Sequence, residues 1–282
     1  MVSTSLRDVA APGGLAPERS RRAALRLAAV SYLNAAPLVH GLSEEPRFAL
    51  ERAVPSAVAE RLHAREADLA TIPSIEYARG EYAIVPGIAI ASRGPVRSVN
   101  LFLRTRLPAV RRVALDTGSR TSVALARLLL RERLPREPEY VAHAPDVGRM
   151  LESCDAALVI GDVALYYDGD AERVDLGEAW SASTGLPFVW AFWAGRPDAL
   201  DVADVARLQR ATAEGVRAIP EIARSWSGGD PARAALNERY LLDNIAYAFG
   251  EAERAGLREF HARAQAAGLI ARVPEIHFYG DR

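Results

Sequence analysis

Short polar clusters, each beside an apolar segment of strand length, are the parts of this 282-residue sequence with the most capacity for chemistry. Open α/β sheets bind their ligands at the carboxyl ends of the strands. The sequence therefore predicts that these clusters lie at a ligand site. Four clusters follow predicted strands and a fifth precedes one: residues 31–34, 72–77, 116–122, 161–162 and 94–100.

The cluster DTGSRTS at residues 116–122 has the composition of an anion-binding site. It begins a predicted helix, whose first backbone N–H groups are free to donate, and it adds several hydroxyl groups. The alternative is an ordinary helix N-cap, since serine and threonine begin many helices. The residues alone leave both interpretations open. The candidate substrate contacts in this cluster are Thr117, Gly118, Ser119, Arg120 and Thr121.

Amide and carboxyl side chains in the other clusters could bind a ligand or move a proton. Asn34 could present its amide, which both donates and accepts, or it could cap the helical stretch predicted for residues 35–42. Glu76 and Asp162 could act as acid or base, or could lie at helix N-termini, where carboxylates are favoured in any case. The remaining candidate substrate contacts are Ser31, Ser74, Ser98, Asn100, Gly161 and Asp162.

The composition excludes several classes of chemistry. All 35 basic residues are arginine, so neither a lysine Schiff base nor a P-loop lysine is available. With one cysteine and five scattered histidines, the sequence has no disulfide and no metal-ligand spacing, and we expect no metal. A net charge of −1 argues against a nucleic-acid partner. Arginine still suits carboxylates, so a small anionic ligand remains compatible.

Strand-like and helix-like segments alternate in a way that predicts two α/β units. No GxGxxG follows any predicted strand, so dinucleotide binding is not expected. Strands are predicted at residues 25–30, 48–54, 68–72, 101–104, 112–115, 140–141, 156–160 and 187–194. Helices are predicted at residues 35–42, 55–65, 119–133, 146–151, 201–224 with a fresh start at Pro220, 231–242 and 251–267.

The predicted domain organisation is discontinuous. Residues 25–105 and 189–282 form the first domain and residues 106–188 an inserted second domain, so two crossings make a hinge beside a cleft, where ligands preferentially bind. Residues 1–24 have the composition of a disordered extension. They lack the uninterrupted apolar segment of a secretory signal, and no stretch reaches membrane length, so a cytoplasmic protein is expected.

Six stretches of the chain resemble the chorismate dehydratases of the futalosine route to menaquinone. They keep that family's order and spacing from about residue 25 to the C-terminus, which makes them more specific together than any one alone. The stretches are SYLNAAPL (31–38), IPSIEY (72–77), GPVRSVNLF (94–102), DTGSRTSVALARLLL (116–130), ALVIGDVAL (157–165) and DLGEAWSASTGLPFVWAFWA (175–194).

The resemblance implies a type II periplasmic-binding-protein fold and a lyase that removes water from chorismate to give 3-[(1-carboxyvinyl)oxy]benzoate. It also implies that no metal or organic cofactor is needed. In the family, the substrate's own enolpyruvyl carboxylate takes the proton, assisted by the asparagine that matches Asn34. Asn34 is therefore the expected catalytic residue.

Two alternatives share the fold. A sister branch that makes 1,4-dihydroxy-6-naphthoate carries a His-Glu pair where this chain has Gly161-Asp162, which favours the dehydratase. A non-catalytic solute-binding protein for a small carboxylate would share the cleft and the anion site. Such a protein is expected to carry a signal peptide or a lipid-attachment cysteine near its start, and the sequence shows neither.

Overall fold

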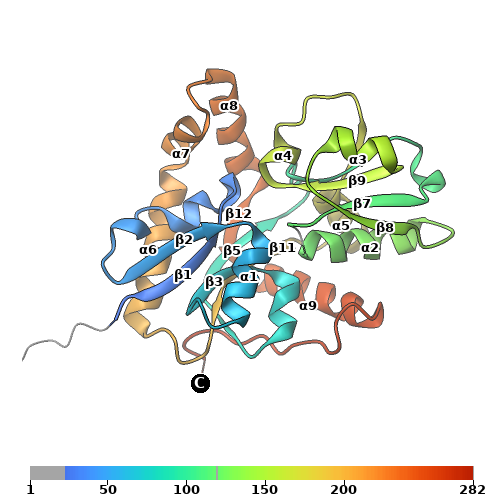
Figure 1. Cartoon of the computed structure of the whole chain (residues 1–282). Coiled ribbons are helices and arrows are strands. Elements are labelled where there is room, and N and C mark those ends of the chain that lie inside the picture. Colours follow the sequence, from blue (N-terminus) through green and yellow to red (C-terminus); the bar gives the residue numbers. More distant parts are fainter. Residues whose placement is uncertain (1–22, 119, 282) are drawn as a thin grey trace, which may run out of the picture.

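The structure, a computed structural model, describes residues 23–118 and 120–281. The disordered extension predicted for residues 1–24 lies outside the described residues except for its last two. Two α/β lobes lie side by side, and each contains a β-sheet flanked by helices (Figure 1). The predicted fold class is confirmed.

The larger, first lobe is built on a sheet with the order β12-β5-β11-β3-β1-β2, and β4 also pairs with β11. Strand β1 lies parallel to β2 and β3, whereas β11 is antiparallel to β3 and β5. Its strands are β1 (Leu25–Val30), β2 (Phe48–Ala53), β3 (Leu69–Pro73), β4 (Ala83–Ile84), β5 (Gly87–Ser92), β11 (Phe188–Gly195) and β12 (Ala246–Phe249).

Helices of several kinds flank this sheet. The α-helices are α1 (Pro55–His63), α6 (Val202–Arg217), α7 (Ile219–Trp226), α8 (Pro231–Arg239) and α9 (Glu251–Ala266). The 3-10 helices are η1 (Leu33–Val39), η2 (Leu42–Glu44) and η3 (Ser74–Arg79), and η5 (Tyr240–Asn244) is a π-helix. Pro220 is the second residue of α7, as the predicted fresh start requires, because proline fits the first turn of a helix but not its interior.

The second lobe has a sheet with the order β10-β6-β9-β7-β8. Strand β7 lies parallel to β8 and β9, and β6 runs antiparallel between β9 and β10. The strands are β6 (Val99–Leu103), β7 (Arg112–Asp116), β8 (Glu139–His143), β9 (Ala156–Ile160) and β10 (Glu172–Asp175). The helices are α2 (Thr121–Arg133), α3 (Val147–Ser153), α4 (Gly161–Leu165), α5 (Leu176–Thr184) and the 3-10 helix η4 (Leu107–Ala109).

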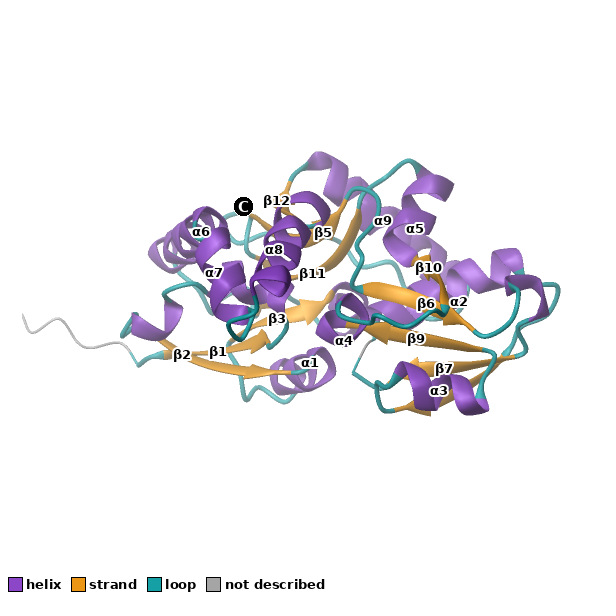
Figure 2. Cartoon of the chain, turned by 90° about the horizontal axis from the view of Figure 1, so that it is seen from above, coloured by secondary structure: helices purple, strands orange, loops and turns teal. Residues whose placement is uncertain are grey.

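The chain crosses between the lobes twice. Because β5 belongs to the first sheet and β6 to the second, the first crossing lies at residues 93–98, earlier than the domain boundary predicted at residue 105. The return lies between α5 and β11, close to the boundary predicted at residue 188. Figure 2 shows the two sheets next to each other, with helices on both sides.

An aromatic cluster packs across the return crossing. The ring of Trp180 on α5 lies 5.2 Å, between centroids, from that of Phe188 on β11, and Phe188 lies 4.9 Å from Phe260 on α9. All three side chains are buried. Edge-to-face aromatic pairs of this kind add stability beyond the area they bury, so this side of the hinge is firmly packed.

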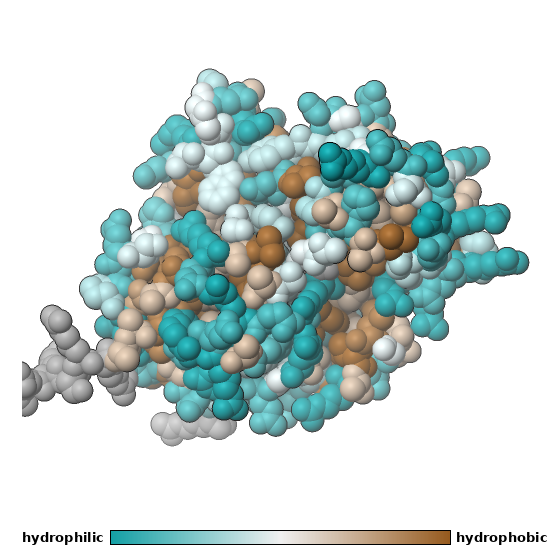
Figure 3. Space-filling model, in the orientation of Figure 1, coloured by the Kyte–Doolittle hydropathy of each residue, from teal (hydrophilic) through white to brown (hydrophobic). Residues whose placement is uncertain are grey.

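The face shown in Figure 3 is mostly hydrophilic, with hydrophobic side chains in small patches. Among the described residues, none of the helices has the length and apolar character needed to cross a membrane.

Candidate active site between the lobes

A pocket lies between the lobes, with a volume of about 430 Å³ that includes space open to solvent. It lies near the carboxyl ends of β1, β3 and β9 and at the start of α2, where the polar clusters of the sequence meet. The first lobe contributes Tyr32, Asn34, Pro55, Pro73, Trp190 and Ala191. The second contributes Val99, Arg120, Thr121, Ser122, Ile160 and Gly161.

Asn34 lies inside helix η1 and lines the pocket. The N-cap of η1 is Tyr32, whose side chain makes no capping hydrogen bond, and Asn34 lies one residue inside the helix, so the capping role considered for Asn34 is wrong. Its side-chain Oδ1 is buried and has no hydrogen-bond partner among the described residues. A buried acceptor left unpaired costs about 1–3 kcal/mol, which a donor on a bound ligand would remove. The backbone carbonyl of Asn34 accepts a hydrogen bond from the Tyr247 hydroxyl at 3.1 Å.

The Tyr32 ring packs against Gly161, and both residues line the pocket. Burial, with the nearby carboxylates of Asp116 and Asp162, raises the pKa of Tyr32 to about 12, so its hydroxyl stays a neutral donor. Gly161 has φ +64°, and a Cβ there would lie 2.9 Å from the Tyr32 ring. Because glycine has no Cβ, the Tyr32 ring can pack directly against this position.

The start of α2 faces the pocket, and some of its polar groups already interact with other parts of the protein. Ser119 lies outside the described residues. Arg120 occupies the N-cap position, and the Thr121 hydroxyl oxygen accepts a hydrogen bond from the backbone N–H of Ile75 at 3.1 Å. The preceding loop turns around buried Asp116, whose Oδ1 accepts from the N–H of Gly118 at 2.8 Å. Thr117 is exposed and is not part of the pocket lining.

Several of the predicted substrate contacts have hydrogen-bond partners within the protein. Asp162 accepts hydrogen bonds from the Leu33 N–H at 3.1 Å and from the Trp226 indole N–H at 2.9 Å, both in the first lobe. Burial raises the pKa of this carboxyl. Since Asp162 itself is in the second lobe, these bonds link the lobes, and Asp162 is not among the residues that line the pocket.

The serine and asparagine contacts behave similarly. The Ser98 hydroxyl accepts from the Tyr240 hydroxyl at 2.7 Å, and Asn100, on β6, donates to the carbonyl of Arg97 in the first crossing at 2.6 Å. Ser74 is buried, with its hydroxyl oxygen 3.4 Å from that of Thr121. Ser31 is half-buried and is likewise absent from the pocket lining.

The pocket thus brings together Asn34, Arg120, Thr121 and Gly161 from the predicted set. Tyr32 and Trp190 also line it, although neither was predicted as a contact. Tyr32 has a signal in the sequence, since it stands in the same cluster as Asn34. Among the described residues, no group of three or more histidine, cysteine, aspartate or glutamate side chains is placed to hold a metal ion.

Comparisons with known proteins agree with this architecture. A family model described as menaquinone biosynthesis matches residues 25–266. The chorismate dehydratase of Thermus thermophilus is 34% identical over 84% of this chain and 93% of its own length.

Solved structures resemble the chain in fold. A protein from Archaeoglobus fulgidus has a TM-score of 0.70 at 20% identity, with 87% of this chain and 98% of that chain covered. The periplasmic aliphatic sulphonate binding protein from Escherichia coli has a TM-score of 0.61 at 16% identity, over 92% and 94% of the two chains. The family match extends through all six sequence stretches on which the resemblance was based, and the resemblance is confirmed. The chain therefore belongs to the family of menaquinone biosynthesis proteins.

Proposed function

We propose that this chain is a chorismate dehydratase, a hydro-lyase that converts chorismate to 3-[(1-carboxyvinyl)oxy]benzoate in menaquinone biosynthesis. One observation carries the proposal: the chain is 34% identical to a chorismate dehydratase, over 84% of this chain and 93% of that protein. The match to a family of biosynthetic proteins also supports action in the cytoplasm.

The reaction makes modest demands on a protein. Chorismate is a dianion, and its ring becomes aromatic when the C4 hydroxyl and the C3 proton leave, so the driving force lies in the substrate. If the substrate's enolpyruvyl carboxylate takes the proton, the enzyme mainly has to orient the substrate and stabilise the charge that develops. We therefore propose that no metal or organic cofactor takes part.

Within the pocket we assign the catalytic assistance to Asn34. Its unpartnered Oδ1 can accept a hydrogen bond from the substrate, and an amide offers donors as well. Tyr32 supplies a neutral hydroxyl close by. Arg120, Thr121 and the first N–H groups of α2 are the groups that suit a carboxylate.

A non-catalytic solute-binding protein is the alternative from another class, since the sulphonate binding protein has a similar fold. That likeness, at 16% identity, speaks for fold alone. The naphthoate-forming branch is disfavoured because Gly161 and Asp162 stand where that branch has its His-Glu pair, and Asp162 is engaged with Leu33 and Trp226.

The experiment is to incubate the purified protein with chorismate and to analyse the products by mass. A dehydratase yields a product lighter than chorismate by one water. A solute-binding protein binds chorismate and returns it unchanged, and that result would replace the proposal.

A further inference from the structure

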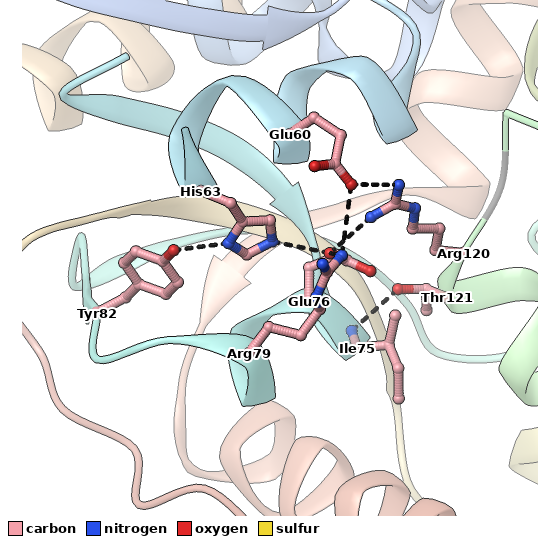
Figure 4. A network of polar contacts seen from close by, with 8 residues as sticks. All are labelled: Glu60, His63, Ile75, Glu76, Arg79, Tyr82, Arg120 and Thr121. Carbon is pink, nitrogen blue, oxygen red and sulfur yellow. Dashed lines mark hydrogen bonds and ion pairs between the residues drawn. The ribbon is translucent and has the colours of Figure 1, made fainter. Parts of the chain in front are cut away.

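Glu76 is a buried carboxylate that the proposed reaction does not use, although its hydrogen-bond partner Arg120 lines the pocket. Glu76 belongs to helix η3 in the first lobe. Its Oε2 accepts hydrogen bonds from His63 Nε2 at 2.8 Å, from Arg79 at 2.9 Å and from Arg120 at 2.9 Å (Figure 4). The other ring nitrogen of His63 lies 2.7 Å from the Tyr82 hydroxyl.

Glu76 determines which way its hydrogen bond to His63 points. An ionised carboxylate only accepts, so Nε2 of His63 donates to Glu76, while Nδ1 lies within hydrogen-bond distance of the Tyr82 hydroxyl. Burial raises the pKa of Glu76, but the hydrogen bond from His63 and the charges of Arg120 and Arg79 outweigh burial and lower it overall. Glu76 is therefore ionised and oriented from one side by His63 and Tyr82.

On the other side, Glu76 shares Arg120 with a second carboxylate. Glu60 on helix α1 accepts from Arg120 Nη2 at 2.6 Å, and Arg79 lies 3.4 Å from the same oxygen. Two arginines and two glutamates thus form a neutral cluster. Arg120 is the member of this cluster that comes from the second lobe, so its guanidinium reaches across the gap between the lobes.

Arg120 is also the one charged side chain among the described residues that line the pocket. A guanidinium has five N–H donors, and the bonds to Glu76 and Glu60 use two of them. The remaining donors can form hydrogen bonds to a substrate carboxylate, while the two bonds to Glu76 and Glu60 fix the plane of the guanidinium group.

We propose that Glu76, oriented by His63, is a positioning residue that holds the Arg120 guanidinium at the pocket wall, where Arg120 pairs with the ring carboxylate of the substrate. This inference rests on the proposed dehydratase function. The ring carboxylate is the partner because the enolpyruvyl carboxylate acts as the base, and a guanidinium on it would lower its basicity. The ring carboxylate keeps its charge throughout the reaction, so its pairing contributes to substrate binding and not selectively to the transition state.

The test compares Glu76→Gln with Asp204→Asn. Glu76→Gln keeps the shape of the side chain and removes its charge. Asp204 is a buried carboxylate that accepts two hydrogen bonds from Arg47, is not among the pocket residues, and provides a matched loss of an ion pair. We expect the KM for chorismate to rise at least about tenfold in Glu76→Gln, the scale of a disturbed hydrogen bond to a charged group, while kcat changes less than about threefold. Asp204→Asn should leave KM unchanged.

Two further variants keep the test decisive. Arg120→Gln should raise KM at least as much as Glu76→Gln, and the double variant should be no worse than Arg120→Gln alone, because both changes remove one interaction. If Glu76→Gln does not fold, the KM of Arg120→Gln is the deciding measurement. The Arg120 side chain is partly exposed, so we expect its replacement to leave the protein folded.

The inference is overturned if KM stays within twofold of the wild type in Glu76→Gln, or in Arg120→Gln when the first variant does not fold. It is also overturned if kcat falls while KM does not change, because that pattern belongs to a residue acting on the transition state. A wild-type protein without chorismate turnover would instead contradict the proposed function itself, so the two failures are distinguishable.

Discussion

Asn34 places a buried carboxamide oxygen without a hydrogen-bond partner, among the described residues, at the wall of the pocket. If this oxygen contacts the substrate as the reaction proceeds, Asn34→Ala should fold normally and lose at least about a hundredfold in kcat, the scale of losing one oriented polar contact at a reacting centre. Steady-state kinetics together with urea unfolding measure both quantities. Near-normal kcat would remove Asn34 from catalysis.

Gly161 allows a second prediction at the scale of one residue. Gly161→Ala places a side chain at φ +64° and a Cβ 2.9 Å from the Tyr32 ring, so the ring, which lines the pocket, must shift. Gly185→Ala is a matched control, because Gly185 has φ +70° but no described atom within 4 Å of the point where a Cβ would lie. Both variants should lose about 1–2 kcal/mol of stability through backbone strain.

Only Gly161→Ala should also lose chorismate turnover, since Gly185 lies at the end of α5 and is not among the pocket residues. Parallel measurements of unfolding and turnover on the two variants separate strain from the steric effect. Equal turnover in both would show that the packing of Tyr32 against Gly161 does not matter for the reaction.

The sequence predicts the location of the site better than the role of each residue. Asn34, Arg120, Thr121 and Gly161 line the pocket, because each lies at the N-terminal end of a helix and these helix ends meet there. Asp162 instead bonds to Trp226, which lies far along the chain. A cluster shows which polar groups are present, but their partners come from distant segments that no local pattern reveals.

Among the elements of the first sheet, Asp68 links the start of β1 to the end of β11, at the end of the sheet opposite the pocket. Its carboxylate accepts from Arg26 at 2.8 Å, at the start of β1, and from Arg196 at 3.3 Å, after β11. The hydrogen bond from Arg26, opposed by burial and aided by Arg196, lowers the pKa of Asp68 from 3.8 to about 2. A lowered pKa stabilises the fold above pH 4, and this stabilisation is lost as the pH falls toward 2.

Asp68→Asn should therefore reduce the free energy of unfolding by about 1–2 kcal/mol at pH 7, with the difference from the wild type shrinking below pH 4. Asp198→Asn is the control, because Asp198 also neighbours Arg196 but its side chain is 89% exposed. Urea unfolding at pH 7, 4 and 3 tests both. A difference for Asp68→Asn that is constant over this range would contradict the linkage.

Strongly patterned elements could be predicted, whereas strands defined by distant pairing could not. Strands β1, β7 and β9 fall where the apolar runs predict them. Strands β5 and β12 were not predicted: β12 has four residues and pairs only with β5 among the described strands, so its conformation depends on a contact that folding creates. Strand β6 lies next to the crossing, and its own residues do not indicate which sheet it joins.

A ligand that binds between the two lobes of the native protein should stabilise the folded state. Chorismate at a hundredfold excess over Kd should add about 2.7 kcal/mol to the free energy of unfolding. The melting temperature is measured with the variant Asn34→Ala, because its slow turnover leaves the added chorismate intact. The control ligand is benzoate, which has a single carboxylate. A melting temperature equally indifferent to both ligands, or strongly reduced by a chelator, would contradict binding of a dianion without a metal.

The central claim is that the pocket between the lobes dehydrates chorismate. The most direct measurement follows chorismate and its product by mass in parallel reactions of the wild type, Asn34→Ala and Asp204→Asn. The account predicts loss of one water with the wild type and with Asp204→Asn, and at least about a hundredfold slower loss with Asn34→Ala. Unchanged chorismate with folded wild-type protein, or equal rates for wild type and Asn34→Ala, would contradict it.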